Sequence, residues 1–154
     1  MKTICIDLDG TVATKGDRNF YQWHLLDRDL PKNNIIDMVM NYPCDKKIIL
    51  TARNEGYPAT PKTLRKFPDI PNVEKIGREL TKAWVSKYMG EVDDILMKPA
   101  GSYENSAEWK LLQVLELEQK GFDISLVVDD NPEVCDLLTE YGFQVLKVMG
   151  YDEK

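Results

Sequence analysis

The sequence contains a single histidine, His24, and only three cysteines, Cys5, Cys44 and Cys135. The histidine count alone excludes a mechanism that needs several histidines. The cysteines are scattered and form no Cys-x-x-Cys pair, so they indicate neither a zinc site nor a disulfide framework. Because Cys5 and Cys135 stand among apolar residues, we interpret them as core residues.

Long hydrophobic runs are also missing. Apolar runs such as 48–50 and 126–128 are far too short to span a bilayer. No apolar signal-peptide stretch fits before Asp7. We therefore expect a cytoplasmic protein that has no membrane partner.

The net charge of −6 over 154 residues argues against a simple, sequence-independent coat on nucleic acid. The charge is uneven, because basic residues outnumber acidic ones between Tyr57 and Gly90. This basic segment either faces an anionic substrate or forms a solvated helix face. The length fits one domain over residues 1–154, with enough residues to bury a core.

Short apolar runs alternate with helical patterns along the chain. Five runs are typical of buried strands: 3–6, 47–50, 92–97, 124–128 and 143–148. Helix-start signals between them are Pro31, Asn72, Asn105 with Glu108, and Asn131 with Pro132. The alternation predicts an α/β fold, with a parallel sheet covered by helices on both faces. Residues 12–30 and the proline-rich 54–71 lack the pattern, and we predict loop or lid insertions there.

Reactive side chains follow three of the predicted strands. Asp7 ends the first strand, Thr51 the second, and Asp129 and Asp130 the fourth. In parallel α/β sheets, ligands bind beyond the carboxyl ends of the strands. One carboxylate at a strand end is often only a turn former or helix cap. The repetition favours a functional site.

The segment Asp7-Leu8-Asp9-Gly10-Thr11 is the sharpest signal. Two carboxylates two positions apart after a strand can share a divalent cation, and Mg²⁺ prefers oxygen ligands. A carboxylate can also attack phosphorus and form an aspartyl-phosphate. Gly10 permits a sharp backbone turn at this point. The pattern predicts Mg²⁺-dependent phosphoryl transfer.

These motifs resemble those of the haloacid dehalogenase superfamily over nearly the whole chain. Asp7 to Val12 resembles its first motif, Thr51 its second, Lys110 its third, and Val127 to Asp130 its fourth. The resemblance implies a three-layer αβα Rossmann-like fold with a five-stranded sheet and only small caps. Lys98, which directly follows the third predicted strand, is the rival for the third-motif lysine.

The resemblance also implies a role for each motif residue. Asp7 would be the nucleophile and Asp9 the general acid and base. Thr51 would hydrogen-bond a phosphoryl oxygen, and Lys110 would neutralise negative charge. Mg²⁺ would be held by Asp7, the backbone carbonyl of Asp9 and Asp130, with Asp129 in support.

A closer resemblance is to the 3′-phosphatase domains of bacteriophage polynucleotide kinase-phosphatases. It rests on Arg18, the aspartates Asp27 and Asp29, Thr51-Ala52-Arg53, and the spacing from Gly101 to Lys110. It implies that Arg18 and Arg53 bind substrate, a role that suits the planar guanidinium fork. The alternative for both arginines is a surface charge.

This sequence departs from that domain in several ways. No Gly-x-x-x-x-Gly-Lys-Ser/Thr loop is present in these residues, so we expect no kinase half. Ser106 stands where the domain has an aspartate, and the 54–71 insertion is longer. The loop aromatics Tyr21, Trp23, Tyr57 and Phe67 either stack on a base or pack locally.

Our leading hypothesis is a Mg²⁺-dependent phosphomonoesterase that acts on the 3′-phosphate of a nucleic-acid end. The first alternative is a 5′- or 3′-nucleotidase that acts on free nucleotides. An alternative from another class is a phospho-accepting regulator or a binding domain, although receiver domains lack the Asp-x-Asp-Gly-Thr segment.

Overall fold

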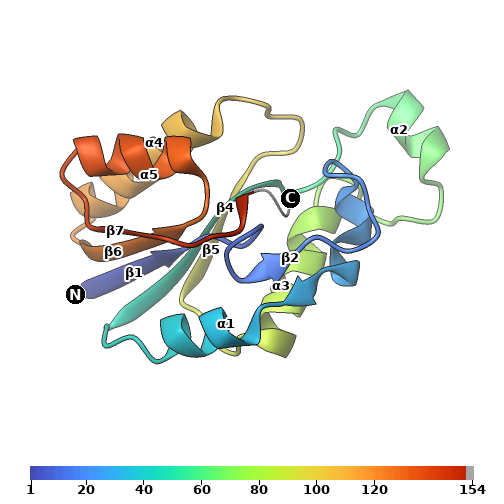
Figure 1. Ribbon diagram of the computed structural model, residues 1–154. Helices are drawn as coiled ribbons and strands as arrows, with labels where there is room; N and C mark the ends of the chain where they lie inside the picture. Colours follow the sequence, from blue (N-terminus) through green and yellow to red (C-terminus); the bar gives the residue numbers. More distant parts are fainter. Residues whose placement is uncertain (152–154) are drawn as a thin grey trace.

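The computed structural model describes residues 1–151 (Figure 1). Its centre is a five-stranded sheet with the order β5-β4-β1-β6-β7, in which all neighbouring strands are parallel. The strands are β1 (Lys2–Ile6), β4 (Lys46–Asn54), β5 (Asp94–Lys98), β6 (Asp123–Asp129) and β7 (Val145–Lys147). The predicted five-stranded parallel sheet is confirmed.

Helices cover both faces of the sheet (Figure 1). Helices α1 (Asn33–Met40) and α3 (Ile76–Tyr88) lie on one face, and α4 (Ser106–Gln119) and α5 (Pro132–Glu140) lie on the other. Successive residues of β1 point to opposite faces, so Ile4 and Ile6 join one core cluster and Cys5 joins the other. This is the three-layer arrangement that the resemblance implied. Within residues 1–151, no helix combines the length and the apolar character needed to cross a bilayer.

Two helix starts follow local capping signals. The Asn105 side chain accepts a hydrogen bond from the Glu108 backbone at 3.0 Å and caps α4. The Asn131 side chain accepts one from the Glu133 backbone at 2.9 Å and caps α5, in which Pro132 is the first residue. These two predictions are confirmed, because an N-cap depends on residues only a few positions apart.

Two other predicted helix starts are wrong. Pro31 belongs to the short strand β3 (Leu30–Pro31), which pairs with β2 (Ala13–Thr14), and α1 begins only at Asn33. A proline fits such an edge strand because it needs no backbone N–H there. Asn72 does not cap α3, which begins at Ile76. Its carbonyl instead accepts a hydrogen bond from the Lys75 backbone in the turn before the helix.

The two predicted insertions contain some regular structure. Residues 12–30 form the β2–β3 hairpin together with the 3₁₀ segment η1 (Trp23–Arg28). Residues 54–71 contain the short helix α2 (Pro61–Lys66), which stands away from the sheet (Figure 1). Strand β4 also extends four residues beyond the predicted end, so Thr51 and Arg53 lie within it rather than after it.

Candidate active site

Three buried carboxylates meet at the carboxyl ends of the neighbouring strands β1 and β6. Asp7 follows β1 directly, Asp129 ends β6, and Asp130 is the next residue. One carboxylate oxygen from each lies within 4.8 Å of the others. The parallel pairing of β1 with β6 brings these residues together although more than a hundred positions separate them in the sequence. Asp7 and Asp130 are therefore close enough to contact one cation.

The Lys110 ammonium bridges two of these carboxylates from α4. It donates to Asp7 Oδ1 at 2.8 Å and to Asp129 Oδ2 at 2.6 Å. Burial disfavours the charged ammonium, but the charges of Asp129 and Asp7 outweigh this effect and raise the pKa of Lys110. Lys110 therefore stays protonated and partly neutralises the acidic cluster.

Asp129 shows the opposite balance. Burial and the nearby charge of Asp7 raise the pKa of Asp129, and the contact with Lys110 only partly offsets them. The Asn131 backbone also donates to Asp129 Oδ1 at 3.0 Å. Like charges in a buried cluster repel one another. Binding of a cation would therefore lower the electrostatic energy of the cluster.

The turn after β1 fits closely against this cluster. The Thr11 hydroxyl lies 2.8 Å from Asp7 Oδ2 and 3.3 Å from Asp130 Oδ1. Gly10 has a φ of +82°, and a Cβ atom at this position would overlap the Asp130 carboxylate. Only glycine combines this backbone conformation with so close an approach.

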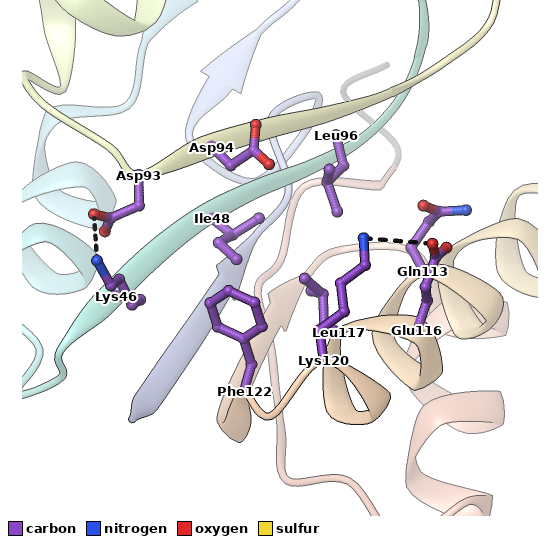
Figure 2. Close-up of a pocket in the computed structure, with 10 residues that line it drawn as sticks. All are labelled: Lys46, Ile48, Asp93, Asp94, Leu96, Gln113, Glu116, Leu117, Lys120 and Phe122. Carbon is purple, nitrogen blue, oxygen red and sulfur yellow. Dashed lines mark ion pairs between the residues drawn. The ribbon is translucent and has the colours of Figure 1, made fainter.

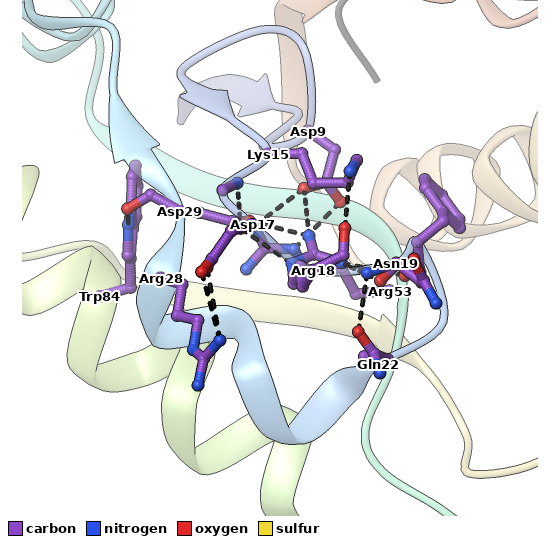
Figure 3. A network of polar contacts seen from close by, with 12 residues as sticks. Asp9, Lys15, Asp17, Arg18, Asn19, Gln22, Arg28, Asp29, Arg53 and Trp84 are labelled. Carbon is purple, nitrogen blue, oxygen red and sulfur yellow. Dashed lines mark hydrogen bonds and ion pairs between the residues drawn. The ribbon is translucent and has the colours of Figure 1, made fainter.

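The Asp9 carboxylate is not part of the three-carboxylate cluster and lies in a second buried network (Figure 3). Arg53 donates to both of its oxygens, from Nε at 3.0 Å and from Nη2 at 2.9 Å. Arg18 approaches Asp9 Oδ1 at 3.4 Å. The predicted contribution of Asp9 to a metal site is through its backbone carbonyl, and this stays a prediction.

Asp29, at the end of η1, ties the two arginines together (Figure 3). Arg18 donates to both Asp29 oxygens at 2.8 Å, and Arg53 Nη2 donates to Oδ2 at 2.8 Å. The Asp29 carbonyl accepts a hydrogen bond from the Trp84 indole at 2.9 Å. Two aspartates and two arginines therefore form a buried network whose formal charges cancel.

The arginines predicted to bind substrate are both buried in this network. Arg53 is 1% exposed and Arg18 is 3% exposed. Burial disfavours the guanidinium charge, but Asp9 and Asp29 outweigh this and raise the pKa of Arg53. Neither arginine is a solvated surface charge. Neither arginine lines the cavity beside Asp7 and Asp9, so contact with a substrate there needs a rearrangement of this network.

The two rival lysines have different surroundings. Lys110 contacts the acidic cluster, whereas Lys98 donates to the Glu104 carbonyl at 2.5 Å and to the Ser106 hydroxyl at 3.2 Å. The geometry therefore favours Lys110 as the lysine of the acidic cluster.

Thr51 is fully buried in β4, and its oxygen accepts a hydrogen bond from the Arg53 backbone at 3.2 Å.

A cavity of about 490 Å³ opens beside the carboxylates. It is lined by Asp7, Asp9, Phe20, Tyr21, Ala52, Ser106, Lys110, Asn131, Val134 and Tyr151. We call it the catalytic cavity. Its walls come from the carboxyl ends of the strands, the η1 side and the start of α4, which is where the sequence predicted a ligand.

A different cavity, of about 410 Å³, lies between the β4–β5 edge and α4 (Figure 2). Ile48, Leu117 and Phe122 contribute apolar surface. Two ion pairs stand at its rim, Lys46 with Asp93 at 3.5 Å and Lys120 with Glu116 at 3.4 Å. It contains none of the strand-end aspartates, so we do not assign the chemistry to it.

Most of the loop aromatics pack locally. Tyr57 and Phe67 stack on each other with ring centroids 4.8 Å apart, and His24 Nδ1 lies 2.7 Å from the Tyr57 hydroxyl. Trp23 is buried. Tyr21 is the exception, because it is 58% exposed and lines the catalytic cavity.

The sequence alone indicates no role for Thr11 or Asp29. Thr11 belongs to the quoted Asp7–Thr11 segment, but its contact with Asp130 depends on the pairing of β1 with β6. In the sequence, Asp29 stands out only as one of two aspartates, with Asp27. In the structure Asp29 is buried in the arginine network, whereas Asp27 is exposed. Only the folded chain distinguishes them.

The donor set suits a hard divalent cation. Asp7, Asp129 and Asp130 offer only carboxylate oxygens, which are the ligands that Mg²⁺ prefers. The residues therefore fit a Mg²⁺ site.

Comparison with known proteins agrees with this geometry. The sequence model of the family "Polynucleotide kinase PNKP phosphatase domain" matches residues 1–152. No curated protein sequence matches the chain.

Two solved structures share the fold. They are titled "Structure of the Pnkp1/Rnl/Hen1 RNA repair complex" and "Structure of Pnkp1/Rnl/Hen1 complex", and each matches with a TM-score of 0.74 and 23% identity. Each match covers 96% of this chain but only 42% and 45% of the other chains, respectively. This chain therefore spans less than half the length of those proteins. The family match over nearly its whole length shows that the chain is a phosphatase that belongs to the polynucleotide kinase PNKP phosphatase domain family.

Proposed function

We propose that this phosphatase is Mg²⁺-dependent and removes the 3′-phosphate from nucleic-acid ends through an aspartyl-phosphate on Asp7. The observation that carries the proposal is the buried cluster of Asp7, Asp129 and Asp130, in which Lys110 bridges Asp7 and Asp129. The family name points to polynucleotide ends as the substrate class. The position of the phosphate on the end is our further step.

The chain's own residues account for each step. An Asp7 oxygen forms the new bond to phosphorus while the bond to the 3′ oxygen breaks, and Asp9 gives the leaving oxygen a proton. Asp9 then takes a proton from water, which attacks phosphorus and releases phosphate and free Asp7. Thr51 and Lys110 would stabilise charge on the transferring phosphoryl oxygens.

Asp7, the Asp9 carbonyl and Asp130 would hold Mg²⁺, with Asp129 in support. When bound, the cation supplies neutralisation of charge on the phosphoryl oxygens. Lys110 and Thr11 orient the carboxylates for this arrangement, since they contact Asp7, Asp129 and Asp130 from two sides.

The arginine network would connect substrate binding to Asp9. Arg53 holds Asp9 in its ionised form, whereas the leaving-group step needs a protonated Asp9. A bound phosphate competes with Asp9 for the guanidinium fork. We propose that this competition frees the Asp9 carboxylate when the substrate arrives.

The hypothesis of Mg²⁺-dependent phosphatase activity is tested with p-nitrophenyl phosphate, first with Mg²⁺ and then with EDTA. We expect turnover that EDTA abolishes and that added Mg²⁺ restores. Turnover that is unaffected by EDTA would reject the metal requirement, and no turnover under any condition would reject the catalytic role of this site.

The substrate is tested with matched oligonucleotides that carry a 3′- or a 5′-phosphate, together with 3′- and 5′-mononucleotides. We expect the 3′-phosphorylated oligonucleotides to give the highest kcat/KM. Equal rates on all of them would remove the polynucleotide-end proposal. Preference for the mononucleotides would support the nucleotidase alternative instead.

A further inference from the structure

A smaller cavity, of about 190 Å³, adjoins the catalytic cavity. The two cavities share four wall residues, Phe20, Tyr21, Ala52 and Ser106. The remaining walls of the smaller one are Trp23, Asn54, Lys98, Ser102, Tyr103, Glu104 and Asn105. None of the strand-end aspartates lines it, so it is a side compartment next to the phosphoryl site.

Two hydrogen-bond donors of these walls have no acceptor within residues 1–151. Among residues 1–151, neither the Trp23 indole N–H nor the Asn54 amide nitrogen has a hydrogen-bond partner, although both side chains are at least 98% buried. Lys98 uses two of its three N–H groups, on Glu104 and Ser106. Buried donors normally have partners, because an unsatisfied one costs about 1–3 kcal/mol. The side compartment is therefore suited to a ligand rich in acceptors.

Aromatic rings form much of the remaining wall. Tyr21 and Tyr103 come from separate loops, and their rings meet edge to face with centroids 5.7 Å apart. They are 58% and 65% exposed, so a large part of each ring is open to solvent. Phe20 packs against Tyr21 at 5.0 Å. These rings offer flat apolar surface to a planar ligand.

We propose that the side compartment binds the nucleobase of the nucleotide that carries the scissile phosphate, with its acceptor atoms facing Trp23 and Asn54. This inference rests on the proposed function. A nucleobase combines stacking faces with ring carbonyl or nitrogen acceptors, which matches the walls. The volume is below the range of pockets for drug-sized ligands and suits one heterocycle.

A backbone phosphate fits the compartment less well. The aromatic walls favour a flat ring, and the negative charge of Glu104 offsets the positive charge of Lys98 among the wall residues, which weakens the attraction for a diester anion. The Trp23 and Asn54 nitrogens are shielded from solvent in this structure. Tyr21, whose ring centroid lies 5.8 Å from that of Trp23, would move aside as the base enters.

The first experiment needs no mutation. Measure kcat/KM for two 3′-phosphorylated oligonucleotides, one ending in thymidine and the other in an abasic tetrahydrofuran unit, with p-nitrophenyl phosphate as a base-free reference. We expect the thymidine end to be preferred about tenfold, the size expected when buried donors gain or lose an acceptor. Equal values would overturn the base compartment, while Mg²⁺-dependent turnover of the reference shows that the phosphatase itself is intact.

The second experiment assigns the preference to the compartment. In Asn54→Leu the thymidine-to-abasic ratio should fall toward one, whereas the exposed Asn34→Leu on α1 should keep the wild-type ratio. A full ratio in a folded Asn54→Leu would overturn the assignment. If this variant does not fold, Tyr103→Ala, which alters an exposed wall residue, is used in its place and is read in the same way.

A third comparison separates the base from the backbone. The phosphodiester that precedes the terminal nucleotide is replaced by an uncharged methylphosphonate. We expect the thymidine-to-abasic ratio to be unchanged by this replacement. If the ratio disappears with the charge, a backbone phosphate occupies the compartment and the base proposal is wrong.

Discussion

Arg53 holds Asp9 by both carboxylate oxygens, at 3.0 Å from Nε and 2.9 Å from Nη2, with the guanidinium almost completely buried. The same guanidinium reaches Asp29 at 2.8 Å. The residue proposed as general acid and base is therefore held by a partner that favours its ionised form. Release of this contact becomes part of the catalytic cycle in our account.

Arg53→Lys tests this relationship. A lysine cannot make the two-point contact, so we expect kcat/KM on a 3′-phosphorylated oligonucleotide to fall on the order of 10–100-fold. We also expect the free energy of unfolding to fall by roughly 2–4 kcal/mol, because a lysine keeps the charge but leaves buried carboxylate oxygens of Asp9 and Asp29 without a donor.

The control is Arg28→Lys, which alters an exposed pair with Asp17. Exposed pairs contribute about 0–1 kcal/mol, so this variant should behave like the wild type in both assays. Unchanged kinetics in Arg53→Lys would show that the buried fork does not position Asp9.

Lys110→Met tests the charge balance of the acidic cluster. The variant leaves Asp7 and Asp129 buried without their shared cation, so we expect a loss of about 3–5 kcal/mol in urea denaturation at pH 7 without metal. Added Mg²⁺ should restore more stability than it adds to the wild type. Turnover should be lost.

The matched control is Lys98→Met, which replaces a second buried lysine whose acceptors are a carbonyl and a hydroxyl. This variant should show no increase in the stabilisation that Mg²⁺ provides. If both lysine variants respond equally to Mg²⁺, the cluster around Lys110 is not the metal site.

Gly10→Ala tests the close approach of the turn to Asp130. The new methyl group would overlap the Asp130 carboxylate and strain a backbone with a φ of +82°. We expect loss of activity and weaker Mg²⁺ binding by titration calorimetry.

Gly121→Ala separates backbone strain from steric overlap, because Gly121 has a φ of +96° but open space around the Cβ position. This control should lose about 1 kcal/mol of stability and keep its Mg²⁺ affinity. Wild-type metal binding in Gly10→Ala would remove Asp130 from the proposed site.

Acid should loosen the 54–71 insertion through His24. Burial, together with the charges of Lys66 and Arg28, lowers the pKa of His24. The unfolded chain therefore takes up a proton at higher pH than the folded chain does. The stabilising contribution is present above the unfolded value of about 6.5 and is lost as the pH falls through the lower folded value.

Hydrogen exchange of the amides at 57–72, corrected for the intrinsic rate, should thus speed up between pH 7 and pH 5. His24→Phe keeps a ring against Phe67 but cannot titrate, and it should remove this dependence. The same acid response in the variant would assign the effect to other groups.

The parts of the fold that the sequence predicted correctly depend on local patterns. The apolar runs of the five strands and the caps at Asn105 and Asn131 are set by residues within a few positions of each other. Pro31 and Asn72 had equally good local signals. They failed as helix starts because the β2–β3 pairing and the turn before α3 took precedence.

The candidate site likewise contains residues whose positions local patterns predict and residues whose positions they do not. Strand ends in a parallel sheet meet at one edge, so the gathering of Asp7, Asp129 and Asp130 followed from the strand predictions. The partnership of Arg53 with Asp9 and Asp29 joins β4, the turn after β1 and the end of η1. No local sequence pattern indicates a contact between these three segments, so the burial of both arginines could not be predicted.

The most direct test of the account is detection of phosphate on Asp7. The enzyme is mixed with Mg²⁺ and p-nitrophenyl phosphate, quenched in acid and digested, and the peptide that contains residues 3–15 is examined by mass spectrometry. This substrate has a good leaving group and needs little help from an acid, so Asp9→Asn should form the phosphoenzyme and then hydrolyse it slowly. We expect a phosphorylated peptide that accumulates in Asp9→Asn and is absent from Asp7→Asn. Metal-dependent turnover without any phosphate on Asp7, or phosphate on another residue, would contradict the central claim.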